Sequence, residues 1–78
     1  MSFKDQGNAA FKEGNYPLAI SHYTNALKET ATDHTILSNR AAAYQNCGQF
    51  AAALADAEKC IEIKPDWGKG YQRKAMAL

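Results

Sequence analysis

Apolar residues recur along the chain at spacings of three and four, the pattern of helices that are buried along one side. The clearest run lies in the first half of the chain and consists of Ala19, Ile20, Tyr23, Ala26 and Leu27. Alanine, the best helix former, is also in excess. The pattern predicts an all-α fold built from short helices.

Capping and turn residues divide this pattern into five predicted helices. The first covers residues 3–14 and stops at Gly14, because glycine tolerates the left-handed conformation that follows a helix. Asn15 and Pro17 open the second, since asparagine caps helices and the missing N–H of proline is harmless in the first turn. The remaining helices are predicted from an Asp33 cap to about Gly48, over about 50–63 before Pro65, and from an Asp66 cap to Leu78.

A repeat with an offset of 34 positions relates the two halves of the chain. Residues 14–20 and 48–54 match glycine to glycine, aromatic to aromatic and alanine to alanine, and the same offset carries Asn39 to Arg73. We therefore expect one domain of paired helices, which is either an excised piece of a longer protein or a unit that self-associates through its last helix. Its units are repeat one at about 3–32, repeat two at about 34–65 and a partial third repeat at 66–78.

Small and aromatic residues stand at fixed places in each repeat. Ala19 with Ala26, and later Ala53 with Cys60, would let paired helices approach closely, while an aromatic residue fills the space beside each pair. The two aromatic residues are Tyr16 and Phe50. This order of residues, with a closing proline at Pro65, resembles the tetratricopeptide repeat over essentially the whole chain. The resemblance implies antiparallel helix pairs stacked into a right-handed superhelix, whose first helices line a concave groove.

Composition narrows the possible functions. The 78 residues are 46% hydrophobic and 22% charged, which is ordinary for one small globular domain. The net charge of +1 lacks the basic surplus typical of nucleic-acid-binding domains. No apolar run approaches the length of a membrane span. Cys47 and Cys60 have no CxxC spacing, which favours a reducing compartment, so we expect a cytoplasmic location.

Five polar residues are predicted to lie on the groove side of the stack. Lys4 and Asn8 are four positions apart on the first helix, and Lys69 and Arg73 are four apart on the fifth, so each pair projects from one face. Asn39 on the third helix is the repeat equivalent of Arg73. The five supply charged and amide hydrogen-bond donors without a carboxylate among them, a set that suits a carboxylate ligand.

These five positions also resemble those of the carboxylate-clamp tetratricopeptide domains of heat-shock co-chaperones. That group carries K-x-x-x-N, S-N-R-x-A-x-Y and K-x-x-x-R on its first, third and fifth helices. This chain matches the three motifs at residues 4–8, 38–44 and 69–73, and residues 64–71 are most similar to the first such domain of Hop-type co-chaperones.

The resemblance implies a protein–protein interaction module rather than an enzyme. Its partners would be the C-terminal Glu-Glu-Val-Asp tails of the seventy- and/or ninety-kilodalton heat-shock chaperones, with the terminal aspartate held by the five clamp residues. An aliphatic residue of the tail would rest on Phe11 and Ala42. Lys12 and Lys74 are further candidates at the groove edge.

Other chemistries find less support in the sequence. A phosphate-binding P-loop needs Ser or Thr after its lysine, and Lys69 is followed by Gly70. His22 and His34 lack a second metal ligand at a suitable spacing, and neither cysteine has a catalytic partner. We therefore expect no cofactor, no metal and no catalysis. RNA binding through Tyr71, Lys74 and the clamp cations has little support because the chain lacks a basic surplus.

Two alternatives stay open. The last helix carries apolar residues that would lack a covering helix, so the chain could be a structural scaffold that self-associates through this end. The apolar residues concerned are Ala75, Met76 and Leu78. The clamp could also belong to another co-chaperone, such as an immunophilin, a phosphatase or a ubiquitin-ligase adaptor.

Overall fold

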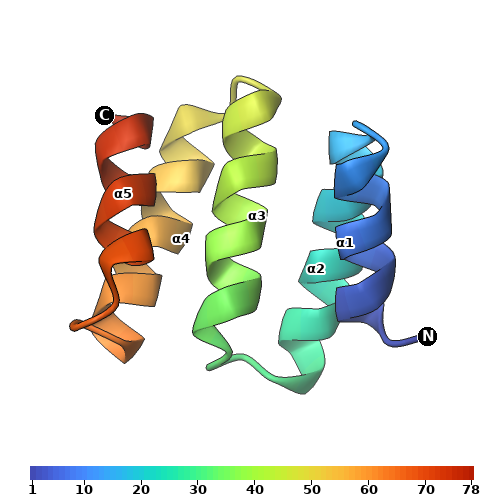
Figure 1. Ribbon diagram of the computed structural model, residues 1–78, viewed down its shortest axis with the longest axis horizontal. Coiled ribbons are helices and arrows are strands. Elements are labelled where there is room, and N and C mark those ends of the chain that lie inside the picture. The colour runs from blue at the N-terminus through green and yellow to red at the C-terminus, as the bar shows by residue number, and fades with distance from the viewer.

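The computed structural model describes residues 1–78 and contains five α-helices and no strands, which confirms the all-α prediction. The helices are α1 (Phe3–Lys12), α2 (Tyr16–Glu29), α3 (His34–Asn46), α4 (Phe50–Ile63) and α5 (Gly68–Ala77). Helices α1, α3 and α5 form one layer, and α2 and α4 form a second layer behind it (Figure 1). None of the five is long and apolar enough to cross a bilayer.

Side-chain caps begin three of the helices. Ser2 accepts a hydrogen bond from the backbone N–H of Asp5 at 3.1 Å, and Asn15 accepts one from Leu18 at 3.4 Å. Asp33 accepts the N–H of Thr35 at 2.9 Å. These bonds satisfy donors that the first turn of a helix leaves free. The predicted caps at Asn15 and Asp33 are confirmed, whereas the Ser2 cap was not predicted.

Two predicted helix ends are wrong. Helix α1 ends at Lys12 rather than Gly14, since Gly14 already has a left-handed backbone with φ of 80°. Asp66 does not cap α5, because a turn closed by the N–H of Trp67 on the carbonyl of Lys64 at 3.1 Å places Trp67 at the N-cap position. The side chain of Trp67 makes no capping hydrogen bond.

Small side chains fill the interface between the two layers, as predicted. Ala19, Ala26, Ala53 and Cys60 are all buried. The Cys60 thiol donates to the carbonyl of His34 at 3.4 Å, and burial raises the pKa of this thiol. Close packing of this kind leaves little room for larger side chains, so adding or removing one methyl group changes the stability.

The two repeat-equivalent aromatic residues behave differently. Tyr16 packs edge-to-face on Phe11 with ring centroids 5.2 Å apart. Phe50 was predicted to fill the equivalent space but is 51% exposed. The position equivalent to Phe11 in the second repeat is Gln45, so Phe50 has no aromatic partner on α3.

One ion pair ties α3 to α4. The Nε and a terminal nitrogen of Arg40 each donate to an oxygen of Asp56 at 2.7 Å, and another terminal nitrogen donates to Thr24 on α2 at 3.2 Å. The two side chains of the pair are 19% and 8% exposed. The hydrogen bond with Asp56 is the main reason that the pKa of Arg40 is raised. Such a buried pair is costly to break on one side, because the remaining charge stays buried without a partner.

We predict that Asp56→Ala lowers the free energy of unfolding by about 3–5 kcal/mol, since it strands the Arg40 guanidinium. Urea unfolding followed by circular dichroism measures the loss. Replacing both partners, by Arg40→Met with Asp56→Leu, should recover most of it. Glu58→Ala is the matched control, because the Lys74–Glu58 pair is exposed and should contribute under about 1 kcal/mol. Equal urea midpoints for Asp56→Ala and Glu58→Ala would contradict the prediction.

Helices α1 and α2 approach each other closely where Gly7 faces Tyr23. A Cβ atom at Gly7 would lie 2.6 Å from two ring carbons of Tyr23, and the ring is only 1% exposed. Gly7 is therefore required for this approach rather than for its backbone freedom.

We predict that Gly7→Ala lowers the free energy of unfolding by up to about 2 kcal/mol. Overpacking costs about 1–3 kcal/mol, which exceeds the gain in helix propensity of about 1 kcal/mol. Gly68→Ala serves as the control, since a Cβ there meets nothing within 4 Å, and it should stay within about 0.5 kcal/mol of wild type. A Gly7→Ala protein with the urea midpoint of the control would show that the ring can move aside.

Candidate functional site

A cavity of about 110 Å³ opens between α1, α3 and α5. Its lining residues are Asn8, Phe11, Tyr23, Asn39, Ala42 and Arg73. The set contains three of the five residues predicted from the sequence to bind a carboxylate, together with both residues predicted to form an apolar surface beside it. Side chains 31 and more positions apart in sequence therefore meet in one place.

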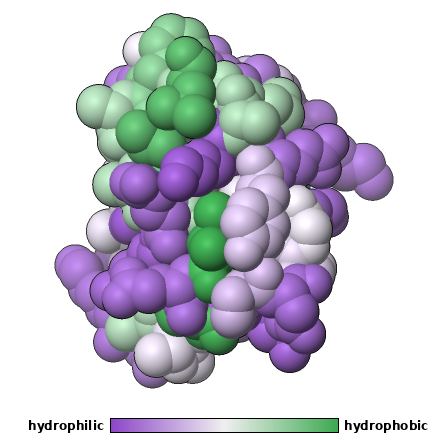
Figure 2. All heavy atoms as spheres, turned by 90° about the vertical axis from the view of Figure 1, so that its left-hand side faces the viewer, coloured by the Kyte–Doolittle hydropathy of each residue, from purple (hydrophilic) through white to green (hydrophobic).

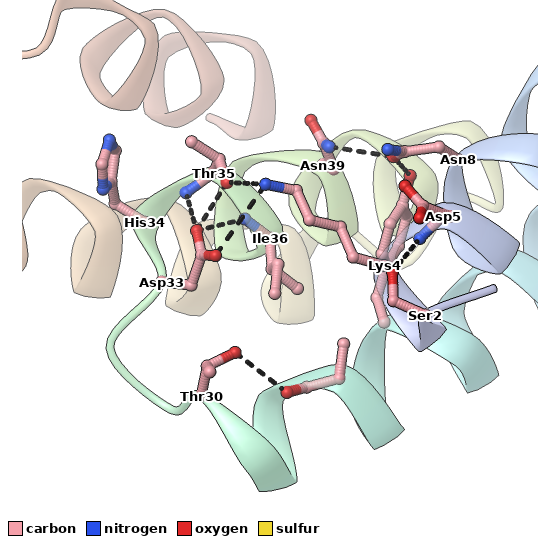
Figure 3. A network of polar contacts seen from close by, with 12 residues as sticks. Ser2, Lys4, Asp5, Asn8, Thr30, Asp33, His34, Thr35, Ile36 and Asn39 are labelled. Carbon is pink, nitrogen blue, oxygen red and sulfur yellow. Dashed lines mark hydrogen bonds and ion pairs between the residues drawn. The ribbon is translucent and has the colours of Figure 1, made fainter.

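Two asparagines and a tyrosine form a hydrogen-bonded group in this cavity. The Tyr23 hydroxyl donates to Asn8 Oδ1 at 2.6 Å, and Asn39 Nδ2 donates to the same oxygen at 3.1 Å. Figure 3 shows Asn39 on α3 reaching across to Asn8 on α1. The pKa of Tyr23 is raised, chiefly because burial disfavours the phenolate, so this hydroxyl is a neutral donor at physiological pH.

Arg73 reaches the cavity from α5. Its Nε donates to Ser38 Oγ at 3.3 Å, and Ser38 is fully buried in α3. The two terminal nitrogens of the Arg73 guanidinium make no hydrogen bond within the chain. They keep the planar fork that matches the two oxygens of a carboxylate.

Lys4 lies beside the cavity rather than in its wall. Its Nζ donates to Thr35 Oγ1 at 2.8 Å and is 3.8 Å from Asp33 Oδ2, so α1 is fastened to the start of α3 (Figure 3). Burial raises the pKa of Asp33, but hydrogen bonds from Thr35 and Ile36 and the charge of Lys4 together lower it below its ordinary value. Any anion that binds Lys4 therefore competes with Asp33.

Lys69 also lies outside the cavity wall. Its Nζ is 5.9 Å from the centroid of the Trp67 ring, a cation–π geometry, and Trp67 in turn packs edge-to-face on His34 at 4.7 Å. The cavity thus brings Asn8, Asn39 and Arg73 together, while aromatic or polar neighbours hold the two lysines nearby.

The two cations predicted at the groove edge do not line the cavity. Lys74 Nζ lies 3.8 Å from Glu58 Oε2 of α4, which draws it toward the second layer, and Lys12 is absent from the lining. The side-chain amide of Gln45 on α3 donates to the backbone carbonyl of Met76 at 3.1 Å and so links α3 to α5. Arg40 is held by Asp56 of α4 and does not line the cavity.

Sequence reasoning missed two residues of the site, Tyr23 and Ser38. Tyr23 was assigned to the apolar stripe of α2, and its spacing gives no sign that its hydroxyl reaches α1. Ser38 stands directly before Asn39 in one of the predicted motifs, which was a usable signal. Both supply a hydrogen-bond partner to a predicted site residue.

No carboxylate lines the cavity, whereas amide and guanidinium donors do. A small anionic group surrounded by such donors would be stabilised by several charge-assisted hydrogen bonds. Phe11 and Ala42 provide apolar surface on one side of the same space. The arrangement suits a ligand with a negatively charged end and an apolar neighbour.

Comparison with known proteins gives matches over nearly the whole chain. Residues 34–66 match the family model described as tetratricopeptide repeat. The chain is 48% identical over 67 residues to "Hsp70-Hsp90 organizing protein 2" of Arabidopsis thaliana, covering 86% of this chain and 12% of that relative. The chain thus spans only a small part of the length of that relative.

Solved structures show the same arrangement of helices. The Sgt2 TPR domain from Aspergillus fumigatus superposes with a TM-score of 0.93 at 40% identity, covering 96% of this chain and 50% of that one. The second TPR of Spaghetti (RPAP3), bound to the HSP90 peptide SRMEEVD, gives a TM-score of 0.93 at 32% identity, covering 96% and 69%.

We predict that Asp33→Asn lowers the urea midpoint at pH 7 but has a smaller effect as the pH falls below about 4. Asparagine keeps the helix cap, so the variant loses only the charge. The folded-state pKa of Asp33 is lowered, so its stabilising charge is present above the unfolded-state pKa and is lost as the pH falls through the folded value. The pair with Lys4 is only partly buried, which limits the loss to about 1 kcal/mol. A difference that stays constant from pH 7 to pH 3 would contradict this assignment.

Proposed function

This chain belongs to the tetratricopeptide repeat family, and from that premise we propose that its cavity binds the C-terminal carboxylate of a partner peptide. The residues in contact with the carboxylates are Lys4, Asn8, Asn39, Lys69 and Arg73. The observation that carries the proposal is the meeting of amide and guanidinium donors in a cavity without a carboxylate. The role is binding rather than catalysis.

The proposed ligand is the Glu-Glu-Val-Asp tail of a heat-shock chaperone, of the Hsp70 or the Hsp90 type. A C-terminal aspartate brings two carboxylates, which suits a site with donors on three helices. The related RPAP3 structure holds the peptide SRMEEVD, and the Arabidopsis relative carries both chaperones in its name. The valine or a preceding apolar residue would rest on Phe11 and Ala42.

The five residues would bind different parts of the ligand, because their surroundings differ. Asn8, Asn39 and the fork of Arg73 line the cavity and would bind the deepest carboxylate. Lys4 and Lys69 stand beside it on flexible stems and would turn toward the second carboxylate. In this movement Lys4 would give up its contacts with Thr35 and Asp33 and bind the ligand instead.

The role of the whole protein is part of the same proposal. The unit is a repeat domain of a co-chaperone, with repeats at about 3–32 and 34–65 and a first helix of a third at 66–78. A cytoplasmic location follows from that role. Hop-type proteins are the preferred assignment because of the identity with the Arabidopsis relative.

We predict that a Glu-Glu-Val-Asp peptide with a free C-terminus binds with a Kd in the low micromolar range, about −7 to −8 kcal/mol, and that its C-terminal amide binds at least tenfold more weakly. Lys69→Ala with Arg73→Ala should abolish binding of the free acid in calorimetric titration. Lys74→Ala is the matched control, because it removes a cation from the same helix that is paired with Glu58. The free-acid affinity should also fall as salt is added.

Equal affinity of the wild-type chain for the free acid and the amide would reject the proposal. Equal losses in Lys74→Ala and in the double variant would also do so, since they would reveal a general charge effect rather than a built site.

Self-association is a second candidate, favoured by one surface. The end of α5 exposes apolar side chains, since Met76 is 50% exposed and Leu78, directly after the helix, is 83% exposed, and Figure 2 shows hydrophobic atoms gathered at the top of the molecule. Light scattering separates the two candidates. The double variant at Lys69 and Arg73 should lose peptide binding and keep whatever oligomeric state the wild-type chain has.

A further inference from the structure

Asn8 differs from the other donors of the site because an amide group can present either its oxygen or its nitrogen to a ligand. The oxygen would repel a carboxylate, whereas the nitrogen would donate to it. The usefulness of Asn8 therefore depends on what holds the amide in one orientation. Two neighbours contact it, Tyr23 and Asn39.

The Tyr23 contact identifies which atom of Asn8 faces inward. The Tyr23 hydroxyl lies 2.6 Å from Asn8 Oδ1, within the usual range for an O–H···O hydrogen bond. The atom next to Tyr23 is therefore the Asn8 oxygen. Asn39 Nδ2 donates to that same oxygen at 3.1 Å, so both donors agree on one orientation.

Tyr23 is suited to hold this orientation. Its ring is 1% exposed and packs against Gly7 of α1, so the fold fixes the position of the ring. Burial raises its pKa, so it stays a donor. Asn39, by contrast, sits on the exposed side of the network and is itself a proposed ligand contact, so a bound peptide would compete for its amide.

We propose that Tyr23 is a positioning residue, which holds the Asn8 oxygen inward and thereby presents the Asn8 NH₂ group to the ligand carboxylate. The inference rests on the proposed function for its ligand. Under this proposal Tyr23, a residue of the second helix layer, helps the site to prefer anions over neutral groups. Tyr23 itself does not contact the ligand's charge.

The test compares wild type, Tyr23→Phe, Asn8→Ala and the double variant, each titrated with the Glu-Glu-Val-Asp peptide as free acid and as amide. Tyr23→Phe should weaken the free acid about five- to tenfold, the ratio expected for one well-oriented hydrogen bond, and should change the amide little. In the Asn8→Ala background the same substitution should change free-acid affinity by less than about twofold, because its effect passes through Asn8.

Tyr16→Phe is the matched control. It removes the hydroxyl of another α2 tyrosine, which packs on Phe11 and whose hydroxyl makes no hydrogen bond. Circular dichroism at the titration temperature verifies that each variant is folded. The ratio of free-acid to amide affinity is the deciding readout, since a mere loss of folded protein lowers both affinities alike.

A second measurement needs no ligand. The side-chain NH₂ signals of Asn8 in a ¹⁵N-correlated NMR spectrum should shift in Tyr23→Phe and stay in place in Tyr16→Phe. An unchanged affinity ratio, an equal loss in the Asn8→Ala background, or unmoved Asn8 signals would each overturn the inference. A wild-type chain that binds both peptides equally would instead reject the proposed function, and with it the role of Asn8 toward a carboxylate.

Discussion

The close approach of α1 to α2 at Gly7 is the constraint on which the candidate site depends. Because Gly7 has no side chain, the Tyr23 ring lies against the backbone of α1, where a Cβ would be 2.6 Å away. The hydroxyl at the end of that ring then reaches Asn8, the next residue along α1. A single missing side chain thus links packing between the two layers to the orientation of a donor in the cavity.

Helix α3 separates two kinds of polar chemistry that are adjacent in sequence. Arg40 turns toward the second layer, where Asp56 and Thr24 satisfy it, so its charge stabilises the stack. Asn39, one position earlier, faces α1 and takes part in the cavity. A charged residue that is fully paired inside the fold is unavailable to a ligand, whereas an amide and the free fork of Arg73 remain available. The cavity wall therefore contains amide and guanidinium donors but no acidic side chain.

Much of the fold could be predicted because its signals are local. Spacings of three and four mark the buried stripes, and Asn15 and Asp33 cap helices through bonds to residues two or three positions away. The start of α5 was predicted wrongly from its local signal, because Asp66 is a good cap in isolation, whereas the 34-residue offset carries the Asp33 cap to Trp67, and the same backbone turn precedes both positions. The prediction that Phe50 fills the space beside its helix pair was wrong. Its pattern matches Tyr16, but the residue at the position of Phe11 is Gln45 in the second repeat, and Phe50 is 51% exposed.

By itself, the sequence determined the helices, the repeat offset and the identity of the polar residues that share a helix face, because these depend on positions within one or two turns. Only the tertiary structure decided the partner of each polar side chain. It placed Asn8, Asn39 and Arg73 in one cavity, gave Lys4 to Asp33 and Lys74 to Glu58, and brought the Tyr23 hydroxyl to Asn8. Such pairings join residues that are mostly 15 or more positions apart, so they depend on how closely whole helices approach, which no local spacing encodes.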